Sequence, residues 1–180
     1  MAQLLSLSQQ QAIKRISPNW AIAQKEPDGN TNYNQLAIEV QEYYLPQLLG
    51  RAFAYDIMEN DESYTTLLDG GEFTDCEGNL SYFKGLRYCL AYYNYAKFVN
   101  DSRMEDTFSG MVYKNRNEST AIQASDVTRL QQEARNIAEL EMEQLKVFLE
   151  LNSSDYPLWN CTAKRKPYQP KIINVRKYGE

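Results

Sequence analysis

The side chains that could do chemistry in this chain are carboxylates, cysteines and tyrosines, because the 180-residue sequence contains no histidine. Histidine acid–base chemistry is therefore excluded. The three cysteines, Cys76, Cys89 and Cys161, form no CxxC pair, so a structural zinc site is not expected. No phosphate-binding glycine loop, nucleophile elbow or zinc-protease motif occurs in the sequence. We expect no catalytic residue, no metal and no cofactor, and we do not expect an enzyme.

An acidic stretch between residues 69 and 77 places several oxygen ligands close together. It contains Asp69, Glu72, Asp75 and Glu77. Carboxylates suit Ca²⁺, but these lack the ligand spacing of an EF-hand loop, and the glycines among them are typical of turns. We therefore expect solvated turn carboxylates. The sequence singles out no carboxylate pair for acid–base catalysis, so an unrecognised enzyme stays open as an alternative.

The tyrosines point to the segment around which the chain is organised, residues 85–99. Read as a helix with 100° between successive residues, this segment has two apolar faces. One is a buried stripe made of Leu86, Cys89, Leu90, Tyr93 and Ala96. The opposite face carries Tyr88, Tyr92, Tyr95 and Val99. A narrow strip is left for water, with Arg87, Ala91 and Asn94.

A helix that is apolar on two faces has to be covered twice. Two arrangements satisfy this requirement: neighbouring helices of the same domain enclose the helix, or its tyrosine-bearing face meets another subunit. Tyrosine suits the second arrangement, because its ring buries apolar area while its hydroxyl tolerates a wet rim. Tyr88, Tyr92 and Tyr95 are therefore candidate protein-interface residues.

Charge is distributed unevenly along the chain, whose formal net charge is −5. Residues 161–180 carry six basic residues and one acidic residue, so this end has a charge of +5 and the rest of the chain has −10. An acidic body is poorly suited to a protein that reads duplex DNA. The basic end is suited to lie on an acidic neighbour, such as another copy of the same body.

The basic end has the features of an extended arm. Pro167 and Pro170 are three residues apart, which favours an extended chain, and the β-branched run after them can add as a strand to a partner. Its candidate interface residues are Lys164, Arg165, Lys166, Tyr168, Ile172, Ile173, Val175 and Arg176. Two alternatives stay open: a solvated terminus without a partner, and a tail whose cations and tyrosines bind single-stranded nucleic acid.

Periodicity and capping residues predict a mainly α fold, a compact helical bundle of about five helices with short irregular or hairpin insertions. We expect a helical domain over residues 1–160 and an extended basic arm over residues 161–180. The expected elements are a short helix capped by Ser8 and ending before Pro18, a helix from Asn32 or Asn34 to Pro46, a helix over 46–60, a turn at 63–68, a hairpin or loop over 72–81, a helix over 81–100, a strand at 111–114 and a helix over 126–151 capped at Ser125–Asp126. No apolar run is long enough for a membrane span, and no secretory signal is visible.

The last predicted helix has one apolar face and one charged face. Its buried stripe is predicted to contain Val127, Leu130, Ala134, Ile137, Ala138, Leu145, Phe148 and Leu149. The opposite face bears Arg135, Glu139, Glu143 and Lys146. Because Glu139 and Glu143 are like charges four residues apart, this exposed face favours basic partners.

Four segments, taken in order, resemble a known group of proteins. They are residues 43–51 (YYLPQLLGR), 67–73 (LLDGGEF), 85–96 (GLRYCLAYYNYA) and the passage over 112–125 that precedes the long final helix. As an ordered set, they resemble the small head–tail connector proteins of tailed bacteriophages, also called adaptor, ring or head-completion proteins. The version found in phages and prophages of gut bacteria is the most similar.

The resemblance implies a structural virion protein at the head–tail interface, assembled in the host cytoplasm as a ring that commonly holds twelve copies. Such a ring docks on the portal protein, extends the DNA channel and provides the attachment surface for a further neck or tail protein. Genomic DNA is expected to pass without specific binding, because an acidic wall does not grip phosphates. No membrane, cofactor or catalytic residue is implied. A tail-completion protein further down the neck and a nucleic-acid-binding accessory protein are the alternatives.

Overall fold

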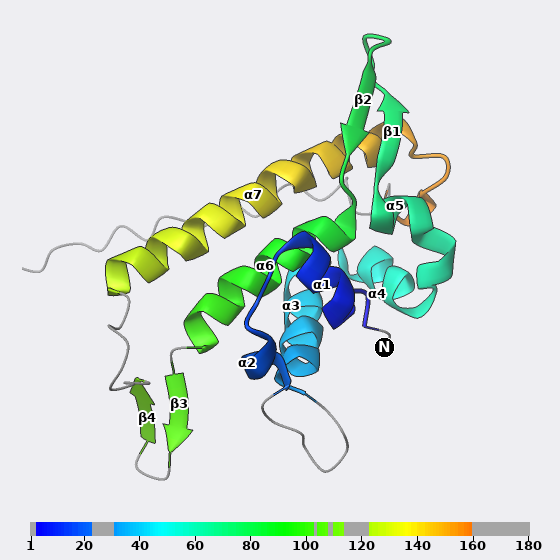
Figure 1. Ribbon diagram of the computed structural model, residues 1–180. Helices are drawn as coiled ribbons and strands as arrows, with labels where there is room; N and C mark the ends of the chain where they lie inside the picture. Colours follow the sequence, from blue (N-terminus) through cyan, green and yellow to red (C-terminus); the bar gives the residue numbers. More distant parts are fainter. Residues whose placement is uncertain (1–2, 23–30, 103, 108–109, 114–122, 160–180) are drawn as a thin grey trace, which may run out of the picture.

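Figure 1 shows the computed structural model, which describes residues 3–22, 31–102, 104–107, 110–113 and 123–159. Within these ranges the chain forms seven α-helices, one short 3-10 helix and two antiparallel hairpins of two strands each. The predicted mainly α fold is therefore confirmed, with short hairpin insertions and with more helices than the five or so expected. Over the same ranges, no helix combines the length and the apolar character that a bilayer span needs.

The N-terminal part of the chain forms α1 (Leu7–Ile13) and α2 (Pro18–Ile22). Ser6, rather than the predicted Ser8, caps α1: its side chain accepts from the Gln9 N–H, and the Gln9 side chain accepts from the Ser6 N–H. This reciprocal pair satisfies two main-chain donors that the first helical turn leaves open. The prediction of Ser8 is wrong because Ser8 already lies inside the first turn.

The next two helices are α3 (Asn32–Leu48) and α4 (Arg51–Glu59). Thr31 caps α3, and Pro46 lies within its last turn instead of starting a new helix as predicted. The missing N–H of proline costs a single hydrogen bond there, and the fully buried Leu45 holds the turn in the core. Gly50, with a φ of 86°, then redirects the chain into α4.

The segment after α4 contains a 3-10 turn (Asp61–Tyr64), the short helix α5 (Thr65–Asp69) and the hairpin of β1 (Gly71–Thr74) and β2 (Leu80–Phe83). The hairpin pairs Gly71 with Phe83 and projects from the body (Figure 1). The Asp75 carboxylate at its tip accepts hydrogen bonds from the N–H groups of Glu77 and Asn79. These bonds, with Asn79 making the largest contribution, lower the pKa of Asp75. Asp75 and Glu77 therefore lie in a turn, as expected, whereas Glu72 lies in β1 and Asp69, at the end of α5, pairs with Arg87.

Two glycines close the base of this hairpin. Gly70 and Gly85 both have positive φ angles, 86° and 84°. A Cβ on Gly85 would lie 2.4 Å from the Gly70 nitrogen and 2.4 Å from the Leu68 oxygen. Only glycine allows this backbone approach, which brings the end of α5 against the start of the next helix.

The central helix α6 (Leu86–Asp101) is followed by the strand pair β3 (Met104–Thr107) and β4 (Gly110–Tyr113) and by the long helix α7 (Ala124–Leu151). α6 begins five residues later than predicted, because residues 81–83 pair in β2. The predicted strand at 111–114 corresponds to β4. The predicted cap of the last helix at Ser125–Asp126 is wrong: Gln123 is the N-cap residue, and its side chain makes no capping hydrogen bond.

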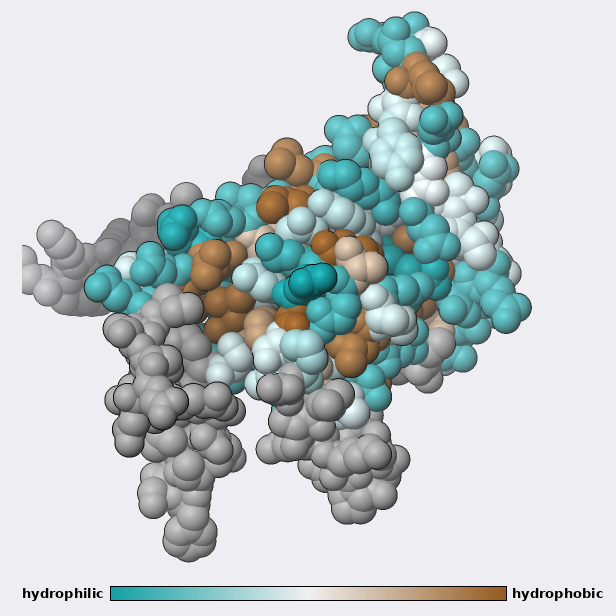
Figure 2. Space-filling model, in the orientation of Figure 1, coloured by the Kyte–Doolittle hydropathy of each residue, from teal (hydrophilic) through white to brown (hydrophobic). Residues whose placement is uncertain are grey.

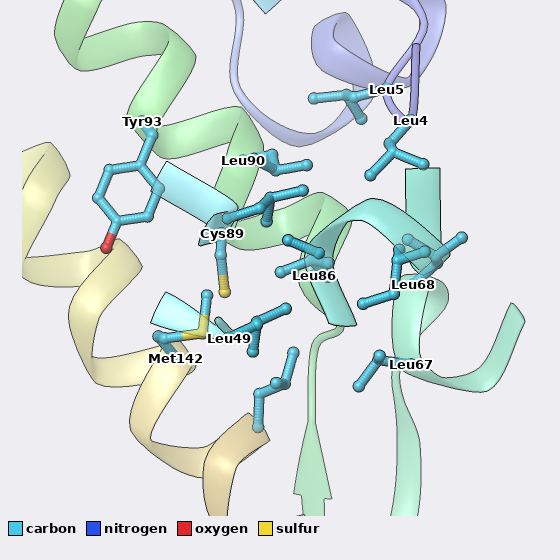
Figure 3. Packing of buried hydrophobic residues seen from close by; sticks show 14 of the residues in the cluster. Leu4, Leu5, Leu49, Leu67, Leu68, Leu86, Cys89, Leu90, Tyr93 and Met142 are labelled. Carbon is cyan, nitrogen blue, oxygen red and sulfur yellow. The ribbon is translucent and has the colours of Figure 1, made fainter. Parts of the chain in front are cut away.

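The core lies where α6 packs along α7, with α3, α4 and the N-terminal segment closing it (Figure 1). The predicted stripe of α6 is buried throughout, at Leu86, Cys89, Leu90, Tyr93 and Ala96. Figure 3 shows Cys89 of α6 and Met142 of α7 on facing sides of this core. Burial raises the pKa of the Cys89 thiol to about 12, so it behaves as a small apolar side chain.

The strip of α6 that lies between its two apolar faces is covered as well. Arg87, Ala91 and Asn94 are predicted to face water, but Ala91 and Asn94 are buried and Arg87 is half-buried. Gln10 of α1 reaches this side and donates to the Ala91 carbonyl, and Arg87 donates to the Leu4 carbonyl. The prediction is wrong because the N-terminal segment covers this strip and offers polar partners to Arg87, to the Ala91 carbonyl and to the Asn94 amide nitrogen.

The chain after α7 packs back on the body. Trp159 is buried, with its ring 6.5 Å from Phe53 of α4. Tyr156 lies 6.2 Å from Phe53 and stacks on Tyr64. This aromatic cluster fixes the last described residue to α4.

Candidate protein-interaction surfaces

The three predicted interface tyrosines of α6, here called the tyrosine face, are half-buried. The rings of Tyr88 and Tyr92 lie 4.9 Å apart, and their hydroxyls are hydrogen-bonded to each other at 3.3 Å. This hydrogen bond, together with burial, raises the pKa of Tyr92 to about 12. Tyr95 lies further along the helix, beside Phe98. The structure thus brings two of the three tyrosines into direct contact, with part of each ring open to solvent.

Two lysines lie on the tyrosine face. Lys84 is 4.5 Å from the centre of the Tyr88 ring, and Lys14 of α1 is 4.4 Å from the centre of the Tyr95 ring. Such cation–π contacts are attractive because the ring faces carry negative potential. Lys84 also pairs with Glu141 of α7 at 2.8 Å, and this contact raises the pKa of Lys84. The tyrosine face is therefore an aromatic surface with cations at its edges.

The remaining predicted interface residues belong to the C-terminal arm. Lys164, Arg165, Lys166, Tyr168, Ile172, Ile173, Val175 and Arg176 all lie outside the described residues. Their proposed contacts stay a prediction from the sequence.

The largest apolar surface that the sequence reasoning missed is on α7. Four exposed residues form a row, here called the outer stripe: Ile137 (36% exposed), Leu140 (69%), Val147 (40%) and Leu151 (43%). With Gln144 they are spaced by three, four, three and four residues, the spacing of a seam between two packed helices. In the view of Figure 2, hydrophobic side chains lie among hydrophilic ones on the surface along α7.

The predicted place of Ile137 in the buried stripe is wrong. The buried side of α7 is formed by Val127, Ala134, Ala138, Met142, Leu145, Phe148 and Leu149. At 100° per residue, Ile137 points about 100° away from Ala138, toward the outer stripe. The alternation of three and four could have identified the outer stripe, but a helix with two apolar rows does not reveal which row faces its own domain.

A groove runs beside the outer stripe, between α3 and α7, with a volume of about 680 Å³. Tyr44 of α3 and Tyr93 of α6 line it and stack with their ring centres 4.1 Å apart. The α7 side of this α3–α7 groove carries Glu139, Leu140 and Glu143. Leu140 therefore belongs both to the groove and to the outer stripe.

A second, smaller groove of about 520 Å³ adjoins the first where α3 meets α4. Tyr43 and Tyr55 line it, and both are more than half exposed, at 61% and 57%. Pro46 and Arg51 complete its sides. Aromatic side chains that stay this exposed are typical of protein-binding surfaces.

The residues that could do chemistry are dispersed. Cys76 is exposed on the hairpin, whereas Cys89 is buried in the core. Nowhere in the described ranges do three cysteine or carboxylate side chains come together as ligands for a metal ion. The surfaces that stand out over these ranges are apolar and aromatic.

Comparison with known proteins gives one match. A family model described as "Family of unknown function (DUF6712)" matches residues 45–169, which include most of the helical body from the end of α3 onward. No curated protein and no solved structure matches the chain.

Proposed function

The chain belongs to the family of unknown function DUF6712, and we propose that it is a structural protein of a tailed bacteriophage that forms a ring at the head–tail interface. In this role it docks on the portal protein, extends the DNA channel and provides the attachment surface for the tail. The outer stripe of α7 carries the proposal, together with the sequence resemblance to head–tail connector proteins.

The outer stripe supports self-assembly because the described residues of one copy leave it exposed. Leu140 alone is 69% exposed, and a row of large apolar residues along a helix, here interrupted by Gln144, is favourable to bury against another helix. Association that buries this row lowers the free energy, because apolar surface is removed from water. We assign the outer stripe to contact with a second copy.

The charges around the outer stripe favour a ring over a two-fold dimer. Glu133, which pairs with Arg129, lies in line with the outer stripe, and Glu143, which pairs with Lys146, lies on its flank; in total α7 carries six acidic and three basic residues. Pairing two such acidic helices through the same surface brings like charges together. A head-to-tail contact joins two different surfaces instead, and this is the contact that closes a ring.

The tyrosine face is the surface we assign to the other side of this contact. It presents partly exposed aromatic rings and the cations Lys14 and Lys84, whereas the outer stripe has acidic neighbours. Opposite charges across an interface select the correct partner surface and orientation. This assignment keeps Tyr88, Tyr92 and Tyr95 as interface residues.

The body of the chain also suits the wall of a DNA channel. Residues 1–160 carry a net charge of −10, so their surface repels the phosphates of passing DNA. A tail-completion protein further down the neck would need the same surfaces. The position of the ring relative to the portal distinguishes these two roles.

Electron microscopy of purified particles tests the proposal. We expect a ring of copies of this chain between the portal and the tail, with α7 of each copy at the subunit interface. The variant Val147→Gln with Leu151→Gln should produce heads that lack tails, because it removes apolar contact area and keeps residues that favour helices. Glu150→Gln, a change on the same helix, is the matched control. Particles without this chain, or with it elsewhere in the virion, would contradict the proposal.

A further inference from the structure

We propose that the α3–α7 groove receives the basic C-terminal segment, residues 161–180, of a neighbouring copy. This inference rests on the proposed function, since a ring supplies the neighbour. It adds the receiving site for the arm and the chemistry by which that site recognises it.

The floor of the groove is aromatic and offers an unused hydrogen-bond donor. Tyr93 is only 2% exposed, yet it lines the groove, and within the described residues its hydroxyl makes no hydrogen bond. Figure 3 shows its ring reaching from α6 toward α7. Burial raises the pKa of this phenol, so it stays protonated and can donate to a main-chain carbonyl.

Stacked aromatic rings suit a proline-containing segment. Extended chains with prolines three residues apart bind grooves lined by aromatic side chains, because the chain is already ordered and its prolines pack flat on the rings. Pro167 and Pro170 have this spacing in the arm. The stacked pair of Tyr44 and Tyr93 provides the rings, and Leu48 extends the apolar floor.

The groove is lined by the carboxylates of Glu139 and Glu143 and by the single cation Lys146, so its net charge is opposite to that of the arm. Glu139 lines the α7 side and, within the described residues, makes no ion pair. Glu143, on the same side, pairs with Lys146 at 2.7 Å. The arm carries three consecutive cations directly before Pro167. An extended chain with its prolines on the tyrosines brings these cations within reach of the Glu139 carboxylate.

A neighbouring copy is the source of the arm because the groove opens at the proposed ring interface. Leu140 lines the groove and is also the most exposed residue of the outer stripe. A second copy seated on the outer stripe therefore lies directly beside the groove. Entry of its arm would enlarge the contact between the two bodies and add charge pairing to apolar burial.

A fluorescein-labelled synthetic peptide of residues 161–180 tests the recognition. It is titrated into the full chain at concentrations where ultracentrifugation shows monomers, and binding is followed by anisotropy. We expect binding that weakens with salt, about tenfold weaker for Glu139→Lys and about fivefold weaker for Tyr93→Phe. Glu150→Lys, the same charge change on α7 outside the groove, should bind like the unchanged chain. No binding, or equal binding by Glu139→Lys, would overturn the inference.

A second variant tests whether the groove is occupied by the arm of a neighbouring copy or by the arm of the same chain. In the full chain carrying Lys164→Gln, Arg165→Gln and Lys166→Gln, the groove should bind the peptide with unchanged affinity. A severalfold gain would mean that the chain's own arm competes for the groove, and this result would overturn the assignment to a neighbour. A ring seen in particles without peptide binding would contradict this inference alone. Peptide binding in the absence of a ring would contradict only the proposed function.

Discussion

Asn94 of α6 donates a 3.1 Å hydrogen bond to the side-chain oxygen of Gln10 on α1, and both side chains are buried. Gln10 in turn donates to the main-chain carbonyls of Lys14 and Ala91, at 2.7 Å and 3.1 Å. The N-terminal helix is therefore fixed to the central helix by directional polar contacts as well as by apolar packing. Such contacts specify one orientation of α1, because a rotated helix would leave buried polar groups unpaired.

Replacing Gln10 with alanine should lower the free energy of unfolding by about 2–3 kcal/mol, since it leaves a cavity and removes the partner of the buried Asn94 amide. Urea unfolding followed by circular dichroism measures the change. Gln35→Ala, at an exposed position on α3, is the control and should alter stability by less than about 0.5 kcal/mol. A similar small loss for Gln10→Ala would mean that α1 is held by its apolar residues alone.

The pairing of Gln10 with Asn94 also shows the limit of reading a helix from its sequence. The apolar stripe of α6 was predictable, because five residues at helical spacing share one side. The cover over Ala91 and Asn94 was not predictable, since an asparagine on the strip with Arg87 looks solvated unless its partner is known. That partner is 84 residues away in the chain.

The glycines at the base of the hairpin give a second prediction. Gly85→Ala should lower stability by more than about 3 kcal/mol or prevent folding, because the added Cβ meets backbone atoms at 2.4 Å on both sides. Gly78→Ala is the matched control. Its φ is +87°, but no atom lies within 4 Å of the added Cβ, so only the backbone strain of about 1–2 kcal/mol remains. Thermal unfolding of the two variants side by side checks the difference. Equal losses would show that strain, and not the close approach, requires glycine at residue 85.

Tyr64, which belongs to the aromatic cluster with Phe53 and Tyr156, is expected to make the stability of the fold sensitive to alkaline pH. Burial, followed by the hydrogen bond that Tyr64 donates to Asp56, raises the pKa of Tyr64 to about 12 from its ordinary value near 10. The folded state therefore holds this proton more tightly than the unfolded state. Its stabilising contribution is complete below pH 10 and is lost as the pH rises from 10 to 12. Unfolding in urea across this range should show falling stability.

Tyr64→Phe isolates the contribution of this hydroxyl. The variant should be less stable than the unchanged chain at pH 8, because it lacks the hydrogen bond to Asp56, and its stability should fall less steeply between pH 10 and 12. Tyr82→Phe, at an exposed position on the hairpin, is the control and should keep the original slope. An unchanged slope for Tyr64→Phe would place the alkaline sensitivity at the other buried tyrosines.

The candidate surfaces were only partly predictable from the sequence. The tyrosine face followed from the spacing of Tyr88 and Tyr92, and the structure places these two rings in contact. The charged side of α7 was also expected to prefer basic partners, and Glu139 and Glu143 line the α3–α7 groove. The groove itself was hidden, because it depends on how α3 crosses α7, and the sequence pattern of one helix does not contain the angle to the next.

Trp159 is the last described residue, and its ring is wedged against Phe53 of α4 rather than left at the open end of α7. A pull on the residues that follow it is therefore resisted first by interlocked rings on two separate helical segments, and only afterwards by the final turn of α7. The end of the described chain is therefore anchored to α4 as well as to α7. In the ring that we propose, this anchor stands at the point where residues 161–180 begin.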